Sequence, residues 1–269
     1  MPSIPLHGLE FFYETRGEGE ALLLLAGFGC DHSFWDPVSE ALAERFRLIL
    51  PDNRGSGQTK SSGSFTARVC AADAAALLNH LGVARAHVVG HSFGGQIAQE
   101  LAVDSPQRVA SLSLVSTSAQ SSARLSEVVE AAARMALTAP PELCCRAFLP
   151  WMFTEEFFET PGALDSELAR LLRNPHPPSP EGLAAQSSAI ATHNALDRVE
   201  AIRCPTLVLA GPEDYLVPAV HACTLAERIR GSKFVLLERG AHDLIHEFPD
   251  EVSGALLAFL SGLPAGTKS

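Results

Sequence analysis

Short runs of apolar residues recur along the chain and alternate with longer segments of helical periodicity. Most of the runs are continuously apolar, which is typical of strands that helices cover on both faces of a sheet. The turn-rich residues Arg16-Gly17-Glu18-Gly19 separate the first two runs, and Pro51 ends the third. The runs predict strands at Leu9–Tyr13, Ala21–Leu25, Phe46–Leu50, His87–Val89, Leu112–Val115, Thr206–Ala210 and Phe234–Leu237.

Between these runs, apolar residues return at spacings of three and four, the period of an amphipathic helix. The pattern predicts helices at Ala67–Leu81, Gln96–Val103, Ala219–Ile229 and Glu251–Leu260. Strands and helices that alternate in this way form a mainly parallel sheet with helices on both faces. We therefore predict an α/β fold.

Residues 118–197 interrupt the alternation, because they show helical patterns and no convincing strand. The interval contains an aromatic-rich stretch, Phe148–Phe158, and a proline-rich stretch, Asn174–Gly182. We interpret it as a helical cap inserted over one edge of the sheet, with residues 1–117 and 198–269 forming the core. The alternative is an ordinary helical extension whose aromatic residues fill its own interior.

Composition and charge exclude several classes of function. The chain has 269 residues, and its 20 Lys and Arg against 31 Asp and Glu give a formal net charge of −11. Binding to nucleic acid or to anionic lipid requires a basic surface, so we expect neither partner. The longest apolar stretch, Ala21–Phe28, is far shorter than the roughly 20 residues of a membrane-spanning helix, so no membrane span is expected.

The six cysteines include no Cys-x-x-Cys pair. We expect reduced thiols that pack as small apolar side chains, as in a cytoplasmic protein. The N-terminal residues show no basic segment followed by an apolar one, which agrees with that location. No His-x-x-His pattern is present, and no Gly-x-Gly-x-x-Gly opens the first strand–helix unit, so we predict no metal and no organic cofactor.

The strongest local motif is Gly90-His91-Ser92-Phe93-Gly94-Gly95, which follows a predicted strand and precedes a predicted helix. A Gly-x-Ser-x-Gly sequence in that setting is typical of a nucleophile elbow, a sharp turn that exposes a strained serine. Glycines on either side remove Cβ atoms that would collide where strand and helix meet. The alternative is a glycine-rich turn in which Ser92 caps the helix.

A serine hydroxyl is a weak nucleophile and needs a base, which an acid must orient. Asp214 and His242 each follow a late predicted strand, at the end where ligands bind in an open α/β sheet. We therefore predict Asp214 as the acid and His242 as the base. Other candidates are Glu213 for the acid and the following histidines for the base: His32, His91, His193 and His246.

Residues Ala26-Gly27-Phe28-Gly29 end the predicted strand Ala21–Leu25. The backbone N–H groups of Phe28 and Phe93 are candidate donors to the negative oxygen of a tetrahedral intermediate. A plain glycine turn is the alternative interpretation of this segment.

Four motifs follow one another along the chain: Pro51-Asp52-Asn53-Arg54-Gly55-Ser56-Gly57, then Gly90-His91-Ser92-Phe93-Gly94-Gly95, then Gly211-Pro212-Glu213-Asp214 with Pro218, then Gly240-Ala241-His242 with Glu247, Phe248 and Pro249. In this order they resemble the α/β-hydrolase fold superfamily, in its branch of cap-bearing serine esterases, lactonases and cofactor-free haloperoxidases. The resemblance runs from about residue 7 to residue 260. It implies an eight-stranded type of sheet, a catalytic triad of Ser92, Asp214 and His242, and an oxyanion hole formed by Phe28 and Phe93.

The chain departs from the family where Ala26-Gly27 replaces the usual His-Gly before the oxyanion residue. Because that histidine normally braces the loop, its absence leaves the shape of the loop open. Relatives that cleave carbon–halogen bonds or epoxides carry Asp at the elbow, so Ser92 argues against those activities. We interpret Asp52 and Arg54 as structural.

The sequence predicts a hydrolase that acts on an ester-like acyl substrate, namely a carboxylic ester, lactone or thioester. Trp151, Phe148 and Phe153 are candidate substrate-binding residues, because aromatic side chains in a cap suit an apolar small molecule. One alternative keeps the triad but changes the reaction to carbon–carbon bond hydrolysis, lyase chemistry or perhydrolysis. Another is a ligand receptor without catalysis.

Overall fold

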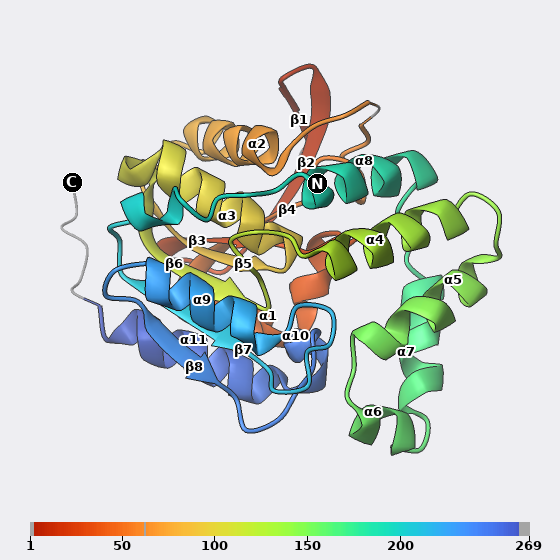
Figure 1. The fold of residues 1–269 in the computed structure, drawn as a ribbon. Coiled ribbons are helices and arrows are strands. Elements are labelled where there is room, and N and C mark those ends of the chain that lie inside the picture. The colour runs from red at the N-terminus through yellow and green to blue at the C-terminus, as the bar shows by residue number, and fades with distance from the viewer. Residues whose placement is uncertain (1–2, 62, 264–269) are drawn as a thin grey trace.

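A twisted sheet of eight strands, counted over the described residues, lies at the centre of the computed structural model (Figure 1). The structure describes residues 3–61 and 63–263. The strand order is β1-β2-β4-β3-β5-β6-β7-β8. The strands are β1 (Ser3–Leu6), β2 (Leu9–Arg16), β3 (Glu20–Leu25), β4 (Phe46–Pro51), β5 (Ala86–His91), β6 (Val109–Val115), β7 (Thr206–Ala210) and β8 (Lys233–Leu236). The pairs β1–β2 and β2–β4 are antiparallel and the other pairs are parallel, which confirms the predicted α/β fold.

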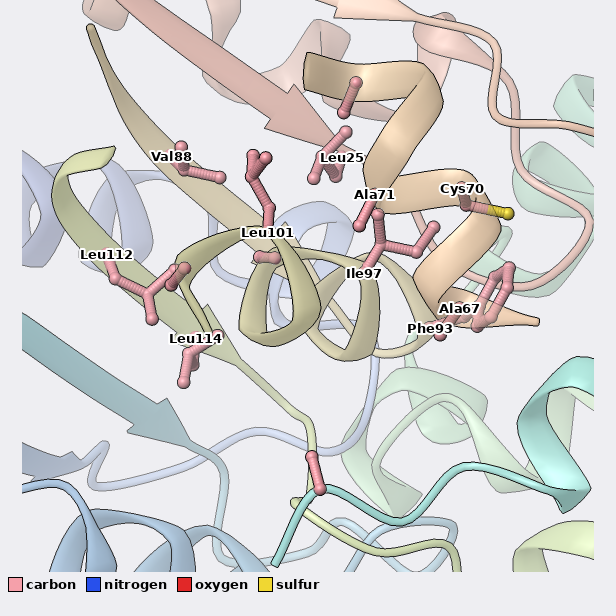
Figure 2. Close-up of a cluster of buried hydrophobic side chains, with 14 of the residues drawn as sticks. Leu25, Ala67, Cys70, Ala71, Val88, Phe93, Ile97, Leu101, Leu112 and Leu114 are labelled. Carbon is pink, nitrogen blue, oxygen red and sulfur yellow. The ribbon is translucent and has the colours of Figure 1, made fainter. Parts of the chain in front are cut away.

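Helices cover both faces of this sheet, and successive residues of one strand contribute to opposite layers. Leu23 and Leu25 of β3 belong to the cluster shown in Figure 2, whereas Leu22 and Leu24 belong to a second cluster. The first cluster packs under α2 (Ala67–His80), α3 (Phe93–Asp104) and α9 (Ala219–Arg228). The second packs under α1 (Asp36–Ala43), the short α10 (Leu244–Glu247) and α11 (Pro249–Ser261). The continuous apolar runs are therefore explained, since both faces of each central strand are buried.

Two elements have weak signals in the sequence. Strand β1 has only four residues, contains Pro5 and is mostly exposed, so it lacks the apolar run that marks the other strands. Helix α1 spans eight residues and has Pro37 in its first turn, where proline is tolerated. Four predicted helices match α2, α3, α9 and α11 to within a few residues, with the largest shift at the first turn of α3.

Residues 118–197 contain helices and no strand among the residues that the structure describes. The helices are α4 (Ala123–Met135), α5 (Pro141–Phe148), α6 (Glu155–Glu159), α7 (Ala163–Leu172) and α8 (Pro180–Ala191). A bridge between Gln120 and Asn194 joins the two ends of this insertion. Helices α4 and α8 contribute to the first cluster, which also packs under α2, α3 and α9, whereas α5, α6 and α7 extend beyond the sheet (Figure 1). We propose that the insertion is the predicted cap; residues 1–2 and 264–269 of the predicted core lie outside the described residues.

Helix α8 lies unusually close to the loop after β4. A Cβ on Gly182 would lie 2.1 Å from the carbonyl oxygen of Gly55, and Gly55 itself has a φ of +82°. Ser179 caps the helix by accepting from the Gly182 N–H, and Pro180 occupies its first turn. Two glycines thus allow a helix of the insertion to dock on the core.

None of the described helices is long and apolar enough to cross a membrane.

We expect Gly182→Ala to lower the free energy of unfolding by about 1–3 kcal/mol, because the added methyl group forces helix and loop apart. Gly254, on α11, provides the matched control, since a Cβ there meets nothing within 4 Å. Gly254→Ala should raise the free energy of unfolding by about 0.5–1 kcal/mol through the higher helix propensity of alanine. Urea unfolding of both variants measures the difference, and equal effects of the two substitutions would contradict the close packing.

Candidate active site

The turn between β5 and α3 holds Ser92 in a backbone conformation that residues other than glycine rarely adopt, with φ 53° and ψ −117°. The glycines around it are sterically required. A Cβ on Gly90 would lie 2.3 Å from the Gly94 oxygen, and a Cβ on Gly94 would lie 1.9 Å from the Leu25 oxygen. The structure thus shows the sharp strand–turn–helix geometry that the Gly-x-Ser-x-Gly motif predicts.

The structure brings together the three side chains that the sequence predicts as a triad. His242 Nε2 lies 2.9 Å from Ser92 Oγ, and His242 Nδ1 lies 2.8 Å from Asp214 Oδ2. All three residues are buried, and Asp214 also accepts a 2.7 Å hydrogen bond from the Val217 N–H. One imidazole is therefore held at both nitrogens, between a hydroxyl and a carboxylate that is fixed on its other side.

The acid and the histidine come from two neighbouring parallel strands. Asp214 lies after β7 and His242 after β8, and the two loops are in direct contact. The Glu213 N–H donates to the Gly240 oxygen at 3.0 Å, and a Cβ on Gly211 would lie 2.2 Å from that same oxygen. Glycine at 211 therefore lets the loops approach until Asp214 reaches the imidazole.

The loop after β3 reaches the same place. Gly27 and Phe28 line a pocket together with Ser92, Phe93 and His242. Within the described chain, the N–H groups of Phe28 and Phe93 have no hydrogen-bond acceptor. The Gly27 position has little room, since a Cβ there would lie 3.3 Å from Ser92 Cβ.

The pocket lies between the sheet edge and the helices of the insertion. Of the three aromatic residues predicted to bind substrate, Phe148 lines it, whereas Trp151 and Phe153 are not among the lining residues. Phe153 instead packs with Leu149 and Leu168 inside the insertion, and Trp151 packs against the main core. Only Phe148 stays a candidate contact. The apolar lining residues absent from the sequence analysis are Leu125, Val129, Met152, Ile190, Leu216 and Val217.

Comparison with known proteins identifies the family. Residues 22–255 match the family model described as "Alpha/beta hydrolase family". The chain belongs to the α/β-hydrolase family. Family and relatives together make it an enzyme of the hydrolase class, which implies a small-molecule substrate.

Three relatives of this hydrolase have different names. A candidate carbamate hydrolase, RutD from Azorhizobium caulinodans, is 33% identical, with 93% of this chain and 94% of that protein aligned. A solved thermophilic esterase from Thermogutta terrifontis is 30% identical with a TM-score of 0.84, over 96% of each chain. A solved enol-lactonase from Burkholderia xenovorans LB400 is 27% identical with a TM-score of 0.88, over 97% of this chain and all of that one.

In this hydrolase, Gln186 on α8 holds the loop that lacks the family's usual histidine. Its Oε1 accepts from the Gly29 N–H at 2.8 Å. Its Nε2 donates to the Arg54 oxygen at 2.9 Å and to Ser56 Oγ at 2.7 Å, and the side chain is fully buried. A helix of the insertion thus ties the loop after β3 to the loop after β4. No local pattern in the sequence marks Gln186, because its partners are far away along the chain.

Asp52 and Arg54 do not line the pocket of this enzyme. Asp52 accepts from the backbone N–H and the ring Nδ1 of His32, both through Oδ1. Arg54 forms two 2.8 Å hydrogen bonds with the buried carboxylate of Asp73. Asn53 donates to the Ala26 oxygen at 2.8 Å, which adds a second brace to the loop after β3.

A second tether joins the insertion to the loop that carries His242. The Asp243 N–H donates to the Met152 oxygen at 2.8 Å. Glu247 accepts hydrogen bonds from the N–H and the hydroxyl of Thr154, and from the Ala241 N–H at 3.4 Å. Burial raises the pKa of Glu247, and the hydrogen bonds oppose that shift because they favour the carboxylate. The histidine loop and the insertion are therefore fixed to each other on both sides of His242.

The other candidate histidines have different surroundings. His91 Nε2 lies 2.9 Å from the His242 oxygen, so it supports the backbone of the candidate base. Burial, with a smaller effect of the nearby His242, lowers the pKa of His91 to about 3, which keeps the ring neutral. His193 lies 3.5 Å from Glu100, His246 pairs with Asp243, and His32 pairs with Asp52. None of these four bonds to Ser92 in the described structure.

No set of three or more His, Cys, Asp or Glu side chains is arranged to hold a metal ion in the part of the chain that the structure describes.

Cys30 lines the pocket, and burial raises the pKa of its thiol, so the sulfur stays protonated near neutral pH.

Two buried histidines make stability depend on pH. Burial lowers the pKa of His91 to about 3 and that of His193 to about 4, whereas unfolded histidine titrates near 6.5. Between those values the unfolded chain binds more protons at these two positions, so their contribution to the free energy of unfolding falls as the pH is lowered from 7 toward 4. Each histidine contributes up to about 1.4 kcal/mol per pH unit.

Urea unfolding at pH 7, 6 and 5 measures this slope. His193→Asn removes one of the two titrating groups at a position outside the pocket, so the variant should lose less stability between pH 7 and 5 than the parent protein. A variant that loses as much stability as the parent would contradict the neutral, buried state of His193.

Proposed function

We propose that the protein hydrolyses an ester-like acyl substrate, a carboxylic ester, lactone or thioester, through an acyl-enzyme on Ser92. The observation that carries the proposal is the placement of His242, with Nε2 at 2.9 Å from the serine hydroxyl and Nδ1 at 2.8 Å from Asp214. This is the arrangement that general-base activation of a serine requires.

In the first half of the reaction, His242 Nε2 takes the proton of Ser92 as Oγ attacks the substrate carbonyl carbon. The carbonyl π electrons move to oxygen, where the N–H groups of Phe28 and Phe93 bind the oxyanion. Asp214 fixes the tautomer with the proton on Nδ1 and stabilises the imidazolium. When the tetrahedral intermediate collapses, His242 gives its proton to the departing oxygen or sulfur, and the acyl group stays on Ser92.

In the second half, His242 takes a proton from water, and the hydroxide attacks the acyl carbon. A second oxyanion forms at the same two N–H groups. Its collapse breaks the bond to Ser92 Oγ, and His242 returns the proton to the serine. The products are a carboxylic acid and an alcohol or thiol, or a hydroxy acid from a lactone.

The pocket supports a mostly apolar substrate, because its wall includes Leu, Val, Ile, Met and Phe side chains from the insertion and from the loop after β7. We propose that the insertion acts as a cap over this pocket, with Phe148 as a substrate contact. Two solved relatives named esterase and enol-lactonase support carboxylic esters and lactones as substrates. The relative named as a candidate carbamate hydrolase adds carbamates, whose carbonyl the same serine can attack. A cytoplasmic location stays a prediction.

Substitutions in the triad test the proposal most simply. A panel of esters, lactones, thioesters, carbamates and diketones identifies a substrate, and Ser92→Ala should then lower kcat/KM by about 10⁵-fold or more, because the nucleophile is lost. Asp214→Asn should lower it by about 10⁴-fold, because the imidazole tautomer is no longer fixed. The far-ultraviolet circular dichroism of each variant serves as the folding control. Turnover that survives in folded Ser92→Ala would overturn the mechanism.

Gln186 tests the oxyanion loop separately. Gln186→Leu removes the acceptor of the Gly29 N–H, so the neighbouring Phe28 N–H should move out of line with the oxyanion. We expect kcat to fall by about 10- to 100-fold, because losing an oxyanion donor entirely costs about 10²- to 10³-fold. The KM should change by less than kcat, since Gln186 does not line the pocket. A rise in KM at constant kcat would show that Gln186 acts on substrate binding instead.

A further inference from the structure

One polar side chain in the pocket has no role in the reaction described above. Gln96 lies on α3 four residues after Ser92, and its N–H donates to the Ser92 oxygen at 3.2 Å. Ser92 itself precedes the helix, and both residues line the same pocket. Gln96 lines the pocket and is 2% exposed.

Only one of the two polar atoms of the Gln96 carboxamide has a hydrogen-bond partner in the described structure. Its Nε2 donates to Ser121 Oγ at 3.0 Å. Its Oε1 is buried and has no hydrogen-bond partner among residues 3–61 and 63–263. Buried polar atoms are nearly always hydrogen-bonded, so an orphaned amide oxygen at a substrate pocket indicates a partner that the substrate supplies.

Two polar groups near Gln96 already have hydrogen-bond partners within the protein. Thr117 donates its hydroxyl to the Ser92 oxygen, and the Ser118 carbonyl accepts from Gln99 Nε2. The rest of the nearby wall is apolar and includes Leu125 and Val129 of α4. Gln96 Oε1 is therefore an unpaired acceptor beside apolar side chains, and a few such polar groups in a mostly apolar wall are what orient a ligand in a pocket.

We propose that Gln96 is a specificity-determining residue that accepts a hydrogen bond from a hydroxyl or N–H group of the substrate. The donor lies near the reacting carbonyl, because Gln96 and Ser92 line the same pocket. The preferred substrates are thus hydroxylated or amino-substituted esters, in preference to plain alkyl esters. The inference rests on the acyl-enzyme function proposed above.

Substrates that differ in a single substituent test the proposed hydrogen bond to Gln96 Oε1. In one series the acyl group varies among p-nitrophenyl esters of 3-hydroxybutanoate, 3-methylbutanoate and 3-methoxybutanoate. The hydroxyl and methyl groups have similar size, but only the hydroxyl donates, and the methoxy group can only accept. In a second series the alcohol part varies between 2-hydroxypropyl and 2-methylpropyl butanoate.

Two variants complete the design. Gln96→Met keeps the length of the side chain and removes its polar atoms. Gln99→Met is the matched control, because Gln99 lies on the same helix, is also buried and also has an unpartnered Oε1, but does not line the pocket.

In at least one series, the parent enzyme should prefer the hydroxylated ester to its methyl analogue by about tenfold or more in kcat/KM. The methoxy ester should lack this advantage. Gln96→Met should lose most of the preference while still hydrolysing the methyl analogue, and Gln99→Met should keep it.

A preference that is absent in both series, or that survives Gln96→Met, would overturn the proposal. Equal preference for the methoxy and hydroxy esters would overturn it as well, since an amide oxygen cannot bond to an ether. Failure of the proposed acyl-enzyme function gives a different result from failure of this inference alone. In that case no ester would show turnover that depends on Ser92, and this inference would fall as well. Ser92-dependent hydrolysis without discrimination would overturn the inference alone.

Discussion

The imidazole of His242 must be held at both nitrogens, and the site depends on this constraint. Its two partners come from different strand ends, Ser92 after β5 and Asp214 after β7, while His242 follows β8. Strands that run parallel in one sheet end at the same edge, which brings residues 92, 214 and 242 together. The loops must also approach within van der Waals contact. Glycines at 94 and 211 meet that requirement, since a Cβ at either would overlap a neighbouring carbonyl oxygen.

The inserted helices are tied to this site on two sides. On one side, Gln186 of α8 holds the Gly29 N–H next to the loop of Phe28. On the other, Met152 and Thr154 bond to the segment around His242. The insertion also supplies part of the apolar wall of the pocket, so substrate contacts and the geometry of the reacting groups are coupled through shared elements. A displacement of the insertion would therefore alter the position of the oxyanion loop as well as the shape of the pocket.

The sequence predicted most of the sheet and the three residues that converge, because those features have local signals. Apolar runs mark strands buried on both faces, and Gly-x-Ser-x-Gly marks a turn with one allowed geometry. Contacts between distant segments have no such signal. Gln186 looks like any helical glutamine, and Phe153 looks like any cap aromatic, although it packs inside the insertion. Strand β1 was missed for a similar reason, because its pairing with β2 buries only one of its residues fully.

The central claim is that the hydroxyl at position 92 is an activated nucleophile. Reaction with a fluorophosphonate, followed by peptide mapping in a mass spectrometer, tests it most directly. The account predicts one adduct, on Ser92, that forms rapidly in the parent protein and far more slowly in His242→Ala. An unlabelled Ser92 in folded protein, or labelling at the same rate without the imidazole, would contradict the account.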